Sequence, residues 1–189
     1  DLRAGIVYLA QHKALLYPLL LTFGGIVLAG PISSVLPAIV NNQGGSLLQL
    51  GLLGGAGSLG ALAGAIYAGT RAEGDPLRTY PIWGVLSALG VGLFVARPLS
   101  LAGGIGLAGL GFLAFSQVVW NTSRVSALAE PAYQARLQSV TSMAFTLGTP
   151  LAAIWGGAAV DRFGLPALLA GAGILVLLSL IVLLGRIRR

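Results

Sequence analysis

The sequence predicts an all-α membrane protein, and two observations carry this prediction. The first is composition, because 56% of the residues are hydrophobic and 8% are charged, whereas soluble domains carry roughly 25% charged residues. The second is the distribution of charge, which leaves long uncharged runs at residues 14–70, 79–96, 98–123, 137–160 and 163–185. A bilayer core accommodates such runs, since one helix crosses it with about 20 apolar residues.

The basic balance of the chain needs a separate explanation. There are 11 Lys and Arg against 5 Asp and Glu, a bias that can indicate a nucleic-acid partner. The basic residues are scattered between the apolar runs and form no patch, so we expect no nucleic-acid binding. The absence of Cys excludes disulfides and Cys-based metal or redox sites.

Six membrane spans are expected. The turn-forming residues 41–45, Asn-Asn-Gln-Gly-Gly, divide the first uncharged run. The spans are predicted at about 14–40, 46–70, 79–97, 99–125, 135–159 and 165–185. Residues 1–13 are expected to form an amphipathic helix or linker in the membrane interface, because Leu2, Ile6 and Leu9 share one helical face. The alternative is an extension of the first span.

Six spans place both termini on one side of the membrane, and the basic residues indicate which side. One set of segments holds only Arg97 and Arg162 between the spans. The other set holds Arg3, Lys13, Arg71, Arg78, Arg124, Arg136, Arg186, Arg188 and Arg189. Because the side richer in Lys and Arg stays in the cytoplasm, we expect a multi-pass protein of the cytoplasmic (inner) membrane with both termini cytoplasmic.

Glycines and prolines shape the predicted spans. The second span contains the GxxxG pairs Gly51/Gly55 and Gly60/Gly64, which predict close helix packing. Prolines remove a backbone hydrogen bond and can kink a helix. The helix-bend candidates are therefore Gly30, Pro31 and Pro150. Either these bends face a cavity, with Ser33, Ser34 and Thr149 as lining candidates beside them, or they are packing kinks.

The fourth span carries a polar face near its end. Gln117 and Asn121 are four residues apart and share this face, with Trp120 beside them. A polar face inside a membrane must contact another helix or water. These three residues are accordingly candidates to line a route for an amphipathic ligand, and the alternative is hydrogen bonding between helices.

Chemistry-bearing residues are sparse at membrane depth. The carboxylates Asp1, Glu73, Asp75, Glu130 and Asp161 and the single histidine, His12, lie outside the predicted spans or at their ends. Proton relays and ion-coupled pumps usually place such a residue inside the membrane. No nucleophile has a base and no cluster has metal-ligand spacing. We therefore expect no enzyme activity, no metal and no cofactor.

Several motifs taken in order resemble a known family. They are the opening stretch Asp1–Leu9 with Gln11–Leu15, the region from Asn121 through Glu130-Pro131 to Arg136–Ser139, and Gly157 with Asp161-Arg162-Phe163-Gly164. Together they resemble the C-terminal half of a major facilitator superfamily transporter, in its drug and siderophore exporter branch. The loop at 69–78 matches the basic cytoplasmic loop of that family only loosely, and Arg71, Asp75 and Arg78 are its gating candidates.

The resemblance implies a fold and a function. The family's six-helix half consists of two inverted three-helix repeats, and two halves rock about a substrate near the midplane. The chain is then expected to export a small amphipathic compound, with the bilayer, an N-terminal six-helix half and the substrate as partners. Two alternatives stay open: a half-size transporter that pairs with a second copy, and a membrane assembly module without transport.

Overall fold

The computed structural model describes residues 2–71 and 76–187, and this part of the chain is helical throughout, without strands. Its helices are α1 (Leu2–Gln11), α2 (Lys13–Ala29), α3 (Pro31–Asn42), α4 (Leu47–Thr70), α5 (Pro76–Ala96), α6 (Leu101–Leu128), α7 (Pro131–Phe163) and α8 (Ala167–Ile187). Five segments are long and apolar enough to cross a membrane, with α2 and α3 counted as one, and α8 adds a shorter apolar helix. The prediction of an all-α membrane protein is confirmed.

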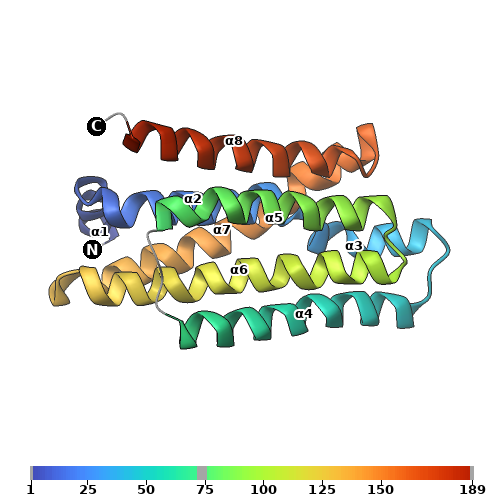
Figure 1. The fold of residues 1–189 in the computed structure, drawn as a ribbon, viewed down its shortest axis with the longest axis horizontal. Coiled ribbons are helices and arrows are strands. Elements are labelled where there is room, and N and C mark those ends of the chain that lie inside the picture. Colours follow the sequence, from blue (N-terminus) through green and yellow to red (C-terminus); the bar gives the residue numbers. More distant parts are fainter. Residues whose placement is uncertain (1, 72–75, 188–189) are drawn as a thin grey trace.

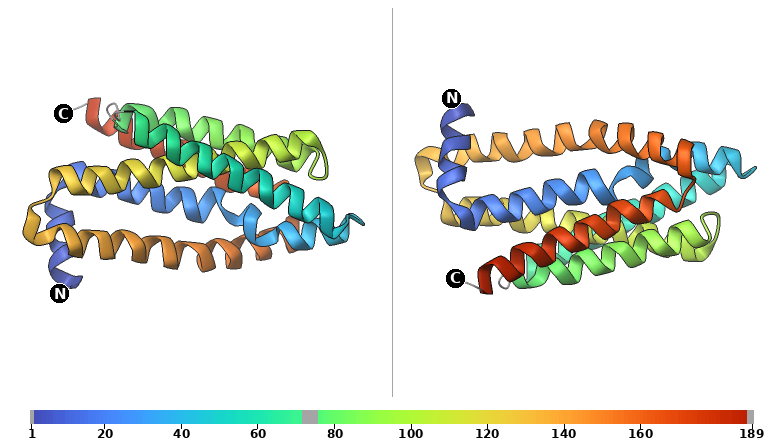
Figure 2. Two further views of the ribbon diagram at one scale, coloured as in Figure 1. Left: turned by 90° about the horizontal axis from the view of Figure 1, so that it is seen from below. Right: turned by 90° about the horizontal axis from the view of Figure 1, so that it is seen from above.

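The long helices run back and forth along one axis, with α8 at one side of the bundle and α4 at the other (Figure 1). The beginning of α2, the end of α6 and the end of α8 lie at the same end of the bundle. There α1 lies across the helix axes (Figure 2). The main pairings are α4 with α6, α5 with α6 and α8, α2 with α7 and α8, and α3 with α7.

The helix bounds differ from the predicted spans most clearly at α7. The span was predicted at residues 135–159, whereas α7 runs from Pro131 to Phe163 and includes Arg136 and Asp161. Pro131 occupies the first turn, where its missing N–H costs nothing, and Gly164 ends the helix with a φ of 75° that favours glycine. The helix thus begins four residues before the predicted span and ends four residues after it.

Gly30 separates α2 from α3, so the first predicted span is two helices. Pro31 has no N–H to donate to the carbonyl of Val27, four residues before it. The indole Nε1 of Trp155 on α7 donates to that carbonyl instead. The neighbouring Gly156 admits the Pro31 ring, since a Cβ there would lie 2.3 Å from Pro31 Cβ. Protein therefore satisfies the backbone group freed at this bend.

Glycine brings the backbones of α4 and α6 together. A Cβ on Gly60 would lie 1.9 Å from the carbonyl oxygen of Ala108, and one on Gly64 would lie 2.2 Å from that of Phe112. Gly51 and Gly55 have no atom within 4 Å of such a Cβ. The predicted packing role is confirmed for Gly60/Gly64 and is wrong for Gly51/Gly55, whose side of α4 is exposed.

Two apolar clusters close the ends of the bundle. The larger draws on α3, α4, α5, α6 and α8 and includes the fully buried Ile32 and Phe94. The second joins α1 and α2 to α6 and α7, with Leu9, Leu15 and Leu137 at its centre. Leu9 of α1 is buried while Ile6 is 52% exposed, so the single apolar face predicted for residues 1–13 is divided between bundle and exterior.

We expect Gly64→Ala to destabilise the bundle and Gly55→Ala to leave it unchanged. The added methyl group collides with the Phe112 carbonyl in the first variant, and overpacking of this kind costs about 1–3 kcal/mol. The second variant places the same group in open space. Thermal unfolding midpoints in one detergent test this contrast, and equal midpoints for the two variants would contradict the glycine contact.

Candidate functional site

The residues singled out in the sequence lie in two different environments. Trp120 and Asn121 are buried and Gln117 is partly buried, all on α6 inside the bundle. Ser33 and Ser34 on α3 and Thr149 on α7 are exposed. The interior group and the exposed group are therefore described separately.

Asn121 belongs to a buried chain of hydrogen bonds that joins three helices. Its Nδ2 donates to the hydroxyl of Thr22 on α2. The Thr22 hydroxyl lies 3.1 Å from the Tyr80 hydroxyl on α5, which donates to the Pro18 carbonyl at 3.2 Å. The Tyr80 hydroxyl also lies 3.4 Å from Asn121 Oδ1. The Asn121 amide thus makes hydrogen bonds between helices.

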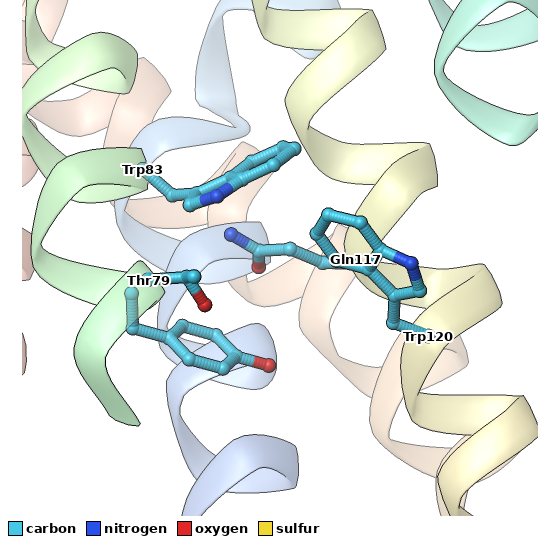
Figure 3. Close-up of a pocket in the computed structure, with 5 residues that line it drawn as sticks. Thr79, Trp83, Gln117 and Trp120 are labelled. Carbon is cyan, nitrogen blue, oxygen red and sulfur yellow. The ribbon is translucent and has the colours of Figure 1, made fainter. Parts of the chain in front are cut away.

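Gln117 and Trp120 line a narrow crevice between α5 and α6, together with Thr79, Tyr80 and Trp83. Figure 3 shows the Gln117 amide reaching between Trp83 and Thr79. The Trp83 and Trp120 rings meet edge to face with centroids 5.2 Å apart. The crevice has no room for a water molecule, so in this conformation it is a packed aromatic contact.

The exposed surface of α7 has two chemically different sides. Ser139, Ser142, Thr146 and Thr149 follow one another at intervals of three or four residues and are all exposed, so they form one stripe along the helix. We call them the α7 hydroxyl stripe. A second exposed stripe consists of Met143, Leu147, Leu151 and Ile154. The same helix therefore presents a polar side and an apolar side to its surroundings.

The exposed surface of α4 is not divided in this way. Gly51, Gly54, Gly55 and Ser58 are exposed along one line of the helix. The exposed Leu47 and Leu62 lie on the same line, four residues from Gly51 and from Ser58. Small and large residues therefore alternate on the outer surface of α4, and α7 alone separates a polar side from an apolar side.

The α7 hydroxyl stripe borders α6 along one edge. Gln138, at the edge of the α7 hydroxyl stripe, donates to the Thr122 carbonyl of α6. Gly54 lies one turn from Leu50, which packs against the cluster containing α3. Seen from below in Figure 2, α6 and α2–α3 run between α4 and α7. The exposed face of α3 adds Ser33, Ser34, Pro37, Ala38 and Asn41.

The hydroxyl groups of this face direct their protons into their own helices. Ser139, Thr146 and Thr149 donate to the carbonyls of Ala135, Ser142 and Phe145 at 3.0, 3.0 and 3.2 Å. Ser33 and Ser58 donate to the carbonyls of Gly30 and Gly54 at 2.9 and 3.1 Å. Each such oxygen retains lone pairs that can accept from water or a passing molecule. The face is uncharged and suited to weak, reversible contacts.

The loop proposed as a gate is described only in part. Arg71 follows the last residue of α4 and is exposed, and its carbonyl accepts from Trp120 Nε1 at 3.4 Å. Asp75 lies outside the described residues, and of Arg78 only its backbone within α5 is described. The contact with Trp120 therefore fixes the end of α4 to α6.

Thr22, Tyr80 and the first two members of the α7 hydroxyl stripe complete these sites, although sequence reasoning had not proposed them as site residues. The stripe carries a signal, because Ser139, Ser142 and Thr146 repeat at helical spacing before Thr149. Thr22 is an isolated polar residue in an apolar span, and nothing in the sequence pairs it with Tyr80. Only the packing of α2 against α5 and α6 brings them together.

The described residues contain no group of three or more His, Asp or Glu side chains that could hold a metal ion. Comparison with known proteins gives no match to a family model, a curated protein or a solved structure.

We expect Tyr80→Phe to lower the stability of the bundle by about 1 kcal/mol, the range measured for hydrogen bonds between membrane helices. The change removes the hydroxyl that links Thr22 to Pro18 and keeps the ring. Tyr17→Phe is the matched control, because the Tyr17 hydroxyl makes no hydrogen bond to the described residues. Unfolding midpoints measure the difference, and a loss as large in the control would refute the role of the Tyr80 hydroxyl.

Proposed function

We propose that the chain is one six-helix bundle of a secondary transporter of the major facilitator type, similar to its drug and siderophore exporters. It moves a small amphipathic compound outward across the cytoplasmic membrane by alternating access. The α7 hydroxyl stripe and the exposed polar residues of α3 border the route, and the apolar side of α7 borders lipid.

The division of the exposed surface is the observation that carries this proposal. On α7, Thr146 and Leu147 are neighbours in the chain, both are exposed, and they lie on different stripes. Lipid hydrocarbon can neither donate a hydrogen bond to a hydroxyl group nor accept one from it. A water-filled route or a second bundle can do both. A purely lipid-exposed bundle has no use for a polar stripe at this depth.

The pairing of the helices supports an organisation as two inverted three-helix repeats. In that scheme α2–α3, α4 and α5 correspond to α6, α7 and α8. The α4–α6 pair then corresponds to the pairing of α7 with α2 and α3, and α5–α6 corresponds to α8–α2. The α5–α8 pair corresponds to itself. Repeats of this kind place the substrate between two bundles.

The proposal assigns different tasks to the candidate residues. Ser33, Ser34 and Thr149 lie on the exposed face and contact the substrate or the water of the route. Thr22, Tyr80 and Asn121 hold α2, α5 and α6 together inside the bundle. In the family's scheme the cytoplasmic side is the α1 end, in agreement with the excess of Lys and Arg expected there.

In this proposal a second bundle covers the exposed face between α4 and α7. That bundle is either another part of the same gene product or a second copy of this chain. A native gene product of about twice the 19.2 kDa of this chain contains a second bundle that covers the face. A product of about 19.2 kDa requires a second copy in that place. The mass of the product in its own membrane decides between them.

We expect Thr146→Cys to react with a charged, membrane-impermeant thiol reagent at least tenfold faster than Leu147→Cys. Thr146 lies on the α7 hydroxyl stripe and Leu147 on the apolar stripe, and a charged reagent enters water and not hydrocarbon. This chain has no Cys, so each variant adds one thiol to it, and the product without either substitution is the labelling blank. Labelling is measured in membranes that contain the full native gene product.

The outcome for transport follows from the same pair of variants. Thr146→Leu should lower efflux of a fluorescent amphipathic dye from cells that lack other exporters, while the conservative Leu147→Ile should not. If both thiols react equally slowly and Thr146→Leu transports normally, the face is not a route and the transporter proposal fails.

A further inference from the structure

The helix α1 carries two faces with different surroundings. Gly5, Tyr8 and Leu9 are buried against the bundle. Ile6 and Val7 are 52% and 50% exposed, on the part of the helix surface that the bundle does not cover. Lys13, which begins α2 directly after this helix, is exposed as well. An apolar outer face beside a cation is the composition of a helix that lies on a membrane surface.

The place where α1 crosses α7 fixes its depth. A Cβ on Gly5 would lie 3.3 Å from Arg136 Cβ and 3.4 Å from a methyl group of Val140. Val140 is partly buried and lies three residues before Met143, the first residue of the exposed apolar stripe. Arg136 is the charge at which the uncharged part of α7 begins. Hence α1 lies beside the point where the charged start of α7 gives way to its uncharged part.

Aromatic stacking holds α1 in this position. The Tyr8 ring stacks on His12 with centroids 3.9 Å apart and on Tyr133 of α7 with centroids 4.4 Å apart. The Glu130 backbone N–H donates to the Tyr8 hydroxyl at 3.3 Å. The Arg136 guanidinium lies 5.4 Å from the centre of the Tyr133 ring. The outer face of α1 is thus presented by a helix that is tied to the α6–α7 connection.

Positive charge is concentrated at this end of the bundle. Among the side chains that the structure describes, this end carries Lys13, Arg71, Arg124 and Arg136 against the single carboxylate of Glu130. The opposite end carries Arg97 and Arg162 against Asp161. The α1 end therefore complements an anionic surface better than the other end does.

We propose that the α1 end is a binding surface for acidic phospholipids. Ile6 and Val7 enter the boundary between headgroups and acyl chains, while Lys13 and Arg136 face the phosphates of anionic headgroups. The inference rests on the membrane location and not on transport, so it stands or falls separately from the proposed function.

Lipid retention tests the proposal. The full protein is purified with an equimolar mixture of phosphatidylglycerol and phosphatidylcholine, and retained lipids are counted by native mass spectrometry. We expect a preference for phosphatidylglycerol that falls about fivefold in Lys13→Ala, since one Lys near an anionic surface contributes about that factor. Arg97→Ala, at the opposite end, is the matched control and should keep the preference.

A depth measurement provides the second readout. Val7→Cys and Gln43→Cys each carry one nitroxide, with Gln43 exposed in the α3–α4 turn as the aqueous reference. The Val7 label should collide more with oxygen and less with a water-soluble nickel chelate than the Gln43 label. The proposal is overturned if the wild type shows no preference for phosphatidylglycerol, if Lys13→Ala and Arg97→Ala behave alike, or if the two labels are equally accessible to water.

Discussion

The bundle depends on how closely helix backbones approach where no hydrophobic force drives them together. Lipid is as apolar as a leucine side chain, so membrane helices associate through van der Waals contact and hydrogen bonds. Gly60 and Gly64 allow α4 to reach the backbone of α6, and Ser116 then donates to the Gly64 carbonyl at 2.9 Å. Gly156 does the same for α7 and α3. These contacts fix the distance of α4 from α6 and of α7 from α3.

Hydrogen bonds between polar groups inside the bundle are the second kind of contact that holds the helices together. Several freed or buried groups find a partner on another helix, as the Val27 carbonyl does with Trp155 and the Thr22 hydroxyl with Asn121, while Thr141 and Ser179 donate to carbonyls of their own helices. No buried side-chain N or O atom among the described residues lacks a partner. Exposed polar residues remain on α3, α4 and α7 at the face between the flanks, and also near the end of α6 and around the end of α1. The buried polar groups thus hold the bundle together, whereas the exposed hydroxyl oxygens can still accept a hydrogen bond from a ligand.

Much of this architecture could be predicted from the sequence, because charge-free runs and turn residues are local signals. The all-α membrane class followed from them, and five of the six expected spans are long and apolar enough to cross a membrane, while α8 is a shorter apolar helix. The roles of Gln117, Trp120 and Asn121 did not, since a polar helical face looks the same whether it meets a cavity or Tyr80 and Thr22. Likewise, Gly51/Gly55 and Gly60/Gly64 are identical as sequence motifs, and only the side of α4 that meets α6 separates them. Such distinctions are properties of packing between segments distant in the chain.

The length of α7 has a further consequence. Its 33 residues extend about 50 Å, and the uncharged part between Arg136 and Asp161 extends about 35 Å, at 1.5 Å per residue. A hydrocarbon core of about 30 Å is thinner than that, and long helices adjust by tilting. Because the Pro31 ring sits against Gly156, a change in the tilt of α7 displaces α3 as well. Bilayer thickness therefore acts mechanically on the α3–α7 pair and on the hydroxyl groups that it presents.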